Sequence, residues 1–180
     1  MEDAGLKLRH ATVEDAEGIA RLHADSWRRN YRGMMRDEFL DGDIMQDRLL
    51  VWRERLHAPA PNQLVVVAED GRALHGFVCV FGDDDARWGS LIDNLHVRHG
   101  VQTKGIGRQL MREAAAWVAL NYPERGLYLW VMQANHNAQG FYEHLGGTNQ
   151  GAEVRQNAQR GPAHVFRYTW PDARALATPA

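Results

Sequence analysis

The fold of this chain is decided by residues 91–119, which read LIDNLHVRHGVQTKGIGRQLMREAAAWVA. The stretch begins as an apolar strand, continues as a short polar loop and ends as an amphipathic helix. Gly105 and Gly107 in the loop have no Cβ, so the backbone can turn sharply and approach a ligand closely. The first N–H groups of the following helix lack partners within the helix. These features together predict an anion site, for which phosphate is a typical occupant.

Two other phosphate-binding motifs fail on the same residues. A dinucleotide fingerprint needs a third glycine where Leu110 stands, and an acidic residue about twenty positions further on. A Walker loop starting at Gly100 would need Lys and then Ser or Thr after Gly105, where the chain has Ile106 and Gly107. On this segment alone, an ordinary strand-to-helix turn remains the alternative.

A second patterned stretch lies at residues 127–147. The apolar run LYLWV predicts a strand, and the following NHNAQGFYEHLGG (residues 135–147) predicts a short helix. Asn135 or Asn137 can cap the start of this helix, and Gly146 can end it in the left-handed conformation. Four side chains at i, i+3, i+4 and i+7 share its apolar face, namely Ala138, Phe141, Tyr142 and Leu145.

The two stretches resemble the two signature motifs of the GNAT superfamily of N-acetyltransferases. The loop Gln102-Thr103-Lys104-Gly105-Ile106-Gly107 is similar to the acetyl-CoA loop of that family, [QR]-x-x-G-x-[GA]. The second stretch is similar to the family pattern N-x-x-A-x-x-F-Y-x-x-x-G-F. Both motifs stand in the order of the family and roughly thirty residues apart, which makes a chance match improbable.

The resemblance implies that acetyl-CoA is the cosubstrate and that residues 102–108 hold its pyrophosphate. For Lys104 and Arg108, a side-chain contact with the phosphates and an ordinary solvated position both remain open. The Asn135 side chain would contact the cofactor arm, and the Tyr142 hydroxyl would lie beside the CoA sulfur. From the residues alone, Tyr142 could also be a core aromatic with a solvated hydroxyl.

The resemblance also implies a split sheet. The fourth and fifth strands, ending near Val97 and Val131, would diverge, and the pantetheine arm would lie between them. A bulge in the fourth strand would free backbone groups of Leu95 and Val97 to bond the arm and to polarise the thioester carbonyl. The full set of predicted cofactor-binding residues is Leu95, His96, Val97, Gln102, Thr103, Lys104, Gly105, Ile106, Gly107, Arg108, Asn135, Ala138 and Tyr142.

The rest of the sequence predicts elements in the order β-α-α-β-β-β-α-β-α-β-β, which is also the order of the family. Asp70-Gly71 is a hairpin signal, and residues 82–87 are expected to form a polar loop. The resemblance therefore implies an α+β fold, a mixed α/β three-layer arrangement. Its central sheet would be mixed but mostly antiparallel, with about seven strands, helices on both faces and the split between strands four and five. Strands are expected near residues 6–9, 64–69, 73–81, 88–97, 127–131, 149–155 and 164–170.

Composition agrees with a small enzyme. A chain of 180 residues with 44% hydrophobic residues can form one domain with a full core, so we expect residues 1–180 to be a single N-acetyltransferase domain. The net charge of -2 provides no basic field for nucleic acid or an anionic membrane, and we expect neither partner. The sequence shows neither a signal peptide nor an apolar run of about eighteen residues, which predicts a cytoplasmic protein.

Cysteine and histidine usage predicts neither a nucleophilic thiol nor a metal site. Cys79 lies in an apolar run, where a buried and inert thiol is the expected state. His96 and His99 at the end of a strand do not form a metal pair, and no other cluster has ligand spacing. We therefore expect no metal.

The implied chemistry is direct attack of a primary amine, from a small molecule or a protein, on the acetyl carbonyl of acetyl-CoA, without an acyl-enzyme. Tyr142 would hydrogen-bond the leaving thiolate and protonate it late. Asp93 acting through a water molecule is the first candidate for the general base, and His96 is the second. Because side chains alternate along a strand, only one of Asp93 and Asn94 should face the cleft.

The acceptor site is predicted from the segment S-W-x-x-x-Y-x-G at residues 26–33. In many GNAT enzymes this region walls the acceptor site, so Trp27 and Tyr31 are predicted acceptor contacts, together with Asn94. Trp27 and Tyr31 are spaced i, i+4, and both could equally pack in the core. These residues do not identify the acceptor.

Two positions depart from the family pattern. His99 stands where a proline often follows the strand, and Gly147 stands where Phe usually follows the helix-ending glycine. Loss of that Phe predicts looser packing or a more open acceptor end of the cleft. Two other functions stay open: a non-catalytic or weakly catalytic acyl-CoA-binding regulatory protein, and a nucleotide-binding α/β protein. A monomer and a homodimer are both compatible with the sequence.

Overall fold

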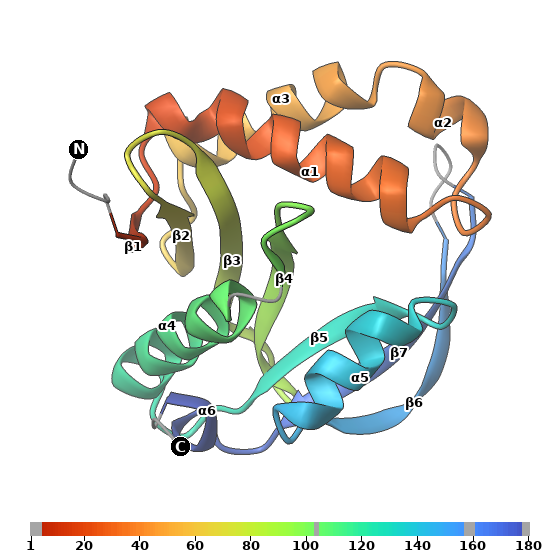
Figure 1. Ribbon diagram of the computed structural model, residues 1–180. Helices are drawn as coiled ribbons and strands as arrows, with labels where there is room; N and C mark the ends of the chain where they lie inside the picture. Colours follow the sequence, from red (N-terminus) through yellow and green to blue (C-terminus); the bar gives the residue numbers. More distant parts are fainter. Residues whose placement is uncertain (1–4, 103–104, 157–160, 178–180) are drawn as a thin grey trace.

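A seven-stranded mixed sheet forms the centre of the computed structural model, which describes residues 5–102, 105–156 and 161–177 (Figure 1). The strand order is β1-β2-β3-β4-β5-β7-β6, and every neighbouring pair is antiparallel except β4 and β5. This topology confirms the predicted sheet. The strands are β1 (Lys7–His10), β2 (Gln63–Glu69), β3 (Leu74–Asp85), β4 (Gly89–Val97), β5 (Leu127–Met132), β6 (Thr148–Arg155) and β7 (Ala163–Trp170).

Helices cover both faces of the sheet. One face carries α1 and α3, while α4, α5 and α6 lie on the other (Figure 1). No helix in the described part of the chain is long and apolar enough to cross a membrane. The helices are α1 (Ala16–Asn30), which follows the 3-10 turn η1 (Val13–Asp15), α2 (Asp37–Asp41), α3 (Ile44–His57), α4 (Ile106–Asn121), α5 (His136–His144) and α6 (Arg174–Ala177).

The ends of several elements follow from local chemistry. The backbone N–H of Thr12 donates to Asp15 over 2.8 Å, which forms the capping box ahead of α1. The Asn135 side chain accepts a hydrogen bond from the Ala138 N–H over 3.2 Å and caps α5. Gly146 has a φ of +80°, the left-handed conformation that ends this helix. The caps at Asn135 and Gly146 fall at the positions that the sequence predicts.

The sheet is split between β4 and β5. Parallel pairing joins only Ser90 with Leu127 and Leu91 with Tyr128, after which the two strands diverge (Figure 1). Residues 92–97 of β4 therefore have no strand partner on the side of β5. Backbone groups along this edge need other partners, because unpaired N–H and C=O groups are costly when buried.

A stack of arginine and tryptophan side chains joins the two halves of the sheet at the closed end of the split. The guanidinium carbon of Arg167, on β7, lies 4.4 Å from the ring centroid of Trp88 and 4.2 Å from that of Trp130. Trp88 belongs to the turn between β3 and β4, whereas Trp130 lies on β5. The Tyr128 hydroxyl of β5 also donates a hydrogen bond to Asp84 of β3.

The prediction of a polar loop at residues 82–87 is wrong. Strand β3 continues to Asp85, which pairs with Gly89, so the connection is a tight hairpin. This end of the hairpin is largely exposed, so the acidic residues 83–85 do not alternate with apolar ones. Without that alternation the sequence gives no signal for a strand here. The short helices α2 and α6 were likewise not predicted.

The expectation that Gly147 loosens the packing is also wrong. A Cβ at this position would lie 2.7 Å from Cζ2 of Trp170 and 2.9 Å from the carbonyl oxygen of Tyr142. Trp170 is buried, and its indole N–H donates to the Leu145 carbonyl over 2.9 Å. The indole thus leaves no room for a side chain at position 147.

We predict that Gly147→Ala destabilises the fold by about 1–3 kcal/mol, because backbone or a buried indole must move. The matched control is Gly140→Ala within α5, where no atom lies within 4 Å of an added Cβ. This control should stabilise the protein by about 0.5–1 kcal/mol, the usual gain of alanine over glycine inside a helix. Urea unfolding of the two variants measures both changes, and equal midpoints would contradict the packing described here.

Candidate active site

The glycine loop places the start of α4 beside the split. Gly105 has a φ of +75° and precedes the first turn of the helix. A Cβ on Gly107 would lie 3.2 Å from Phe141 of α5 and 3.6 Å from Val97 of β4. The first turn of α4 therefore packs closely against both walls of the split, and only small residues allow this approach. Thr103 and Lys104 lie outside the described residues.

A β-bulge interrupts β4 at Asp93. Cys79 of β3 pairs with Asn94 and the next residue, Val80, pairs with Ile92, so Asp93 is the extra residue. A bulge breaks the alternation of side chains. The prediction that Asp93 and Asn94 point to opposite faces is therefore wrong, because both side chains reach Arg55 of α3.

Arg55 organises the polar groups at the bulge. Its Nη1 donates to Asp93 over 2.7 Å and to the amide oxygen of Asn94 over 3.1 Å. The Asn94 amide nitrogen donates to the Asp93 carbonyl over 2.7 Å, so both polar ends of that side chain are engaged. Burial raises the pKa of the neighbouring Cys79 thiol to about 12, which keeps it protonated. The thiol is inert, as predicted.

His96 lies on the face of β4 that is covered by α1. Its Nδ1 is 2.8 Å from the Ser26 hydroxyl, and its ring lies 4.6 Å from that of His23 and 5.4 Å from that of Phe77. Burial, with a smaller contribution from the charge of Arg48, lowers the pKa of His96 to about 3. The imidazole is therefore neutral at physiological pH. Its strand neighbours Leu95 and Val97 pack in the opposite core, against α4.

Tyr142 projects from α5 and interacts electrostatically with Tyr31, at the C-terminal end of α1. Its ring lies 6.1 Å from the rings of both Tyr168 and Trp170. Its hydroxyl makes no hydrogen bond to another described residue. Burial and the nearby Tyr31 raise the pKa of Tyr142, and burial raises that of Tyr31 to about 12. Both phenols are therefore held protonated.

The structure separates the predicted acceptor residues. Trp27 is buried, with its ring 4.6 Å from His23 in an edge-on contact and 4.7 Å from the guanidinium carbon of Arg48. This environment favours the core-packing alternative for Trp27. Asn94 accepts a hydrogen bond from Arg55, and Tyr31 is the predicted acceptor residue that affects the pKa of Tyr142.

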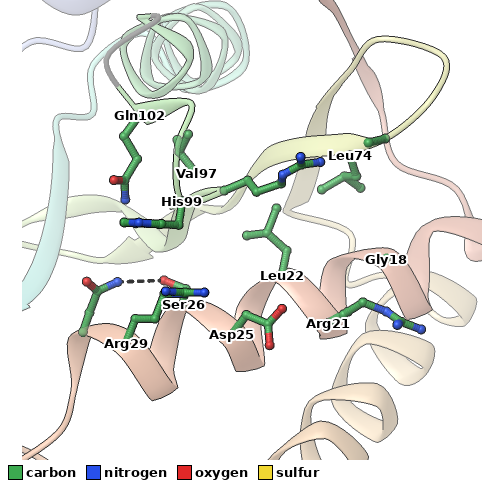
Figure 2. Close-up of a pocket in the computed structure, with 13 residues that line it drawn as sticks. Gly18, Arg21, Leu22, Asp25, Ser26, Arg29, Leu74, Val97, His99 and Gln102 are labelled. Atoms are coloured by element: carbon green, nitrogen blue, oxygen red, sulfur yellow. Dashed lines mark hydrogen bonds between the residues drawn. The ribbon is translucent and has the colours of Figure 1, made fainter.

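A cavity of about 420 Å³ lies between α1 and the end of β4 (Figure 2). His99 and Gln102 point across it toward Ser26 (Figure 2). The Ser26 hydroxyl accepts a hydrogen bond from the Asn30 amide over 3.2 Å. Through Gln102 the cavity adjoins the glycine loop. Its charged lining is mainly basic, with Arg21, Arg29 and Arg98 against Asp25. This balance suits an anionic ligand.

A second cavity, of about 550 Å³, was not predicted. Residues 33–36 after α1 form one wall, and the end of β5 and the start of β7 form the other. Its lining includes Met34, Met35 and Met132. The dipeptide Met34-Met35 directly follows the predicted acceptor segment and is the only sequence signal that could have located this cavity. The described residues contain no group of three or more potential metal ligands.

Comparison with known proteins decides the family. Residues 19–147 match the family model described as the acetyltransferase (GNAT) family. The chain belongs to this family. As a member of the GNAT family it is an acyltransferase. The split sheet with helices on both faces, described above, is the fold of that family.

Individual relatives agree with this assignment. A protein named probable N-acetyltransferase from Mycobacterium tuberculosis is 29% identical over 147 residues, which cover 79% of this chain and 80% of the relative. An uncharacterized N-acetyltransferase from Bacillus subtilis is 25% identical over 132 residues, covering 71% of this chain and 72% of the relative. The PaiA N-acetyltransferase from Thermoplasma acidophilum, solved in complex with coenzyme A, has a TM-score of 0.66 at 19% identity; the match covers 92% of this chain and 99% of that one. At this identity the similarity shows the fold.

The lowered pKa of His96 predicts a pH dependence of stability. The folded protein holds this ring neutral down to about pH 3, whereas the unfolded chain protonates it below its ordinary value of 6.5. Between these values the unfolded state binds the extra proton, so the contribution of His96 makes stability fall as the pH falls. Urea unfolding at two pH values within and above this window should show a smaller loss for His96→Gln than for the wild type. An NMR titration of the His96 ring with a midpoint near 6.5 would contradict this assignment.

Proposed function

We propose that this chain transfers the acetyl group of acetyl-CoA directly to a primary amine, in a ternary complex and without an acyl-enzyme. The observation that carries the proposal is the split between β4 and β5, with the first turn of α4 packed against Val97 of β4 and against Phe141 of α5, the helix that also carries Tyr142. Membership of the GNAT family supports acetyl transfer. The structural relative solved with coenzyme A supports acetyl-CoA as the cosubstrate.

The unpaired edge of β4 provides the surface for the pantetheine arm. Residues 92–97 have no strand partner on the β5 side, so their backbone groups can pair with the two amides of the arm, as an added strand would. Backbone groups of Leu95 and Val97 would bond this arm and polarise the thioester carbonyl. Gln102 and the helix start at residues 105–108 would hold the pyrophosphate, with Asn135 and Ala138 on the facing wall. The basic lining of the 420 Å³ cavity would attract the phosphates.

Tyr142 is proposed to act on the leaving group. The thiol of CoA has an ordinary pKa of about 8.5, and burial places the pKa of Tyr142 above its own ordinary value of 10. The phenol is therefore a hydrogen-bond donor throughout the physiological pH range. A donor aimed at the departing sulfur stabilises the charge that develops there as the C–S bond breaks.

The general base is proposed to be Asp93, acting through a water molecule. Arg55 fixes this carboxylate at the bulge, where the strand edge opens into the split. The second candidate, His96, is a much weaker proton acceptor, because its pKa is lowered to about 3. Asp93 therefore stays the first choice, with His96 as a neutral wall residue that bonds Ser26.

We predict that Tyr142→Phe lowers kcat by about 10²–10⁴-fold, the usual contribution of a positioned acid. Acetyl-CoA affinity, measured by calorimetry, should change little, because the ring and its packing are retained. Tyr122→Phe is the matched control, since that tyrosine packs on Trp117 at the far end of α4. Unchanged turnover in Tyr142→Phe would instead support a role as an acyl-CoA-binding regulator.

For Asp93→Asn we predict a fall in kcat/KM of about 10²-fold or more, with the largest loss at the lower end of the pH profile. The amide can still accept the hydrogen bond from Arg55, so folding should be preserved. Glu113→Gln, an exposed carboxylate on α4, is the control. If the pH profile of kcat/KM is unchanged in shape in Asp93→Asn but altered in His96→Gln, the general base would be His96 instead.

A further inference from the structure

The 550 Å³ cavity, here called the methionine pocket, carries information about the acceptor. The side chains that matter are Met34, Met35 and Arg36 on one wall and Met132, Gln133 and His164 on the other. The first three follow the C-terminal end of α1, and the last three come from the end of β5 and from β7. None of the three comparisons assigns a role to these residues in this chain.

Both walls of the methionine pocket are tied to the proposed reaction centre. The carbonyl of Tyr31 accepts hydrogen bonds from the N–H groups of Met34 and Met35, each over 3.0 Å. On the other wall, the carbonyl of Met132 accepts one from the N–H of Asn135 over 2.9 Å, at the start of the helix that carries Tyr142. The two walls of the pocket are therefore continuous in the chain with the segments that carry Tyr31 and Tyr142.

The lining combines an adaptable apolar surface with positive charge. Methionine side chains are unbranched and polarizable, and they fit linear apolar groups of varied shape. The only titratable side chains in the described lining are Arg36 and His164, and it includes no carboxylate. Such a lining repels polyamines and aminoglycosides, whose several positive charges need acidic partners.

Arg36 is available for an anion. It lines the pocket, and its Nε lies 3.5 Å from the position that a Cβ on Gly161 would take. It forms no ion pair with any described residue, whereas the nearby Arg32 pairs with Asp37 and Asp41. A planar guanidinium in this state matches the geometry of a carboxylate.

We infer that the acceptor is a primary amine that carries both an apolar side chain and a carboxylate, as apolar amino acids do. This inference rests on the proposed function. The acceptor nitrogen forms a C–N bond with the acetyl carbon while the C–S bond to CoA breaks. One proton of the ammonium leaves to the base before attack, and a second goes to the thiolate, so the products are the N-acetylated acid and free CoA. The apolar chain would occupy the methionine pocket and Arg36 would hold the carboxylate.

The test compares matched pairs of amines. Methionine, leucine and phenylalanine are each assayed beside the amine that lacks only the carboxylate, namely 3-(methylthio)propylamine, isopentylamine and phenethylamine, with spermidine as a polycation. CoA release and the mass of the product are measured together. We expect kcat/KM to favour each amino acid by about tenfold or more over its partner, the size of one charge-assisted contact. Spermidine should be the poorest acceptor.

Variants assign the preference to Arg36. Arg36→Gln should raise KM for the amino acids by about tenfold and leave the carboxylate-free amines unchanged. Arg53→Gln, an exposed arginine on α3 outside both cavities, is the control and should change neither series. A preference for spermidine or for the carboxylate-free amines would overturn the inference, as would an equal effect of Arg36→Gln on both series. If spermidine or a carboxylate-free amine is acetylated and no amino acid is, the inference fails and the proposed function stands; if acetyl-CoA does not bind, the proposed function itself fails.

Discussion

The architecture of this enzyme depends on the loss of backbone pairing between two parallel strands. β4 and β5 share only two residue pairs and then separate, which leaves one edge of β4 without a strand partner. An unpaired edge is normally a liability that proteins cover or shorten. Here the glycine loop, α5 and the end of α1 surround it instead. The edge is thereby both protected from other chains and presented to a ligand that has amide groups of its own.

Charge is distributed around this edge so that few groups ionise close to it. Burial holds the phenols of Tyr31 and Tyr142 protonated, and it holds His96 neutral. The charged pair in this region, Arg55 and Asp93, lies at the bulge. A neutral wall strengthens each remaining polar contact, because interactions are less screened away from water.

Much of the fold could be predicted from the sequence because its signals are local. The glycine loop, the caps at Thr12 and Asn135 and the end of α5 at Gly146 each lie within a few residues of the element they define. The site was harder to predict, since its decisive contacts join distant segments. No local pattern relates Arg55 to Asp93, or Trp170 to Gly147, and the bulge that turns Asp93 and Asn94 to one side depends on pairing with β3. The walls of the methionine pocket likewise come from segments that are far apart in the sequence, so no local pattern predicts the pocket.

The stack of Trp88, Arg167 and Trp130 gives the split a fixed opening angle. Two strands that share so few hydrogen bonds would otherwise act as a hinge. The sandwiched guanidinium joins the β3–β4 turn to β5 and β7 on the closed side of that hinge, so rotation about it would break both ring contacts at once. The width of the opening is thus influenced by side chains at the closed end of the split. Substitutions in this stack would change the separation of β4 and β5 rather than the reaction chemistry.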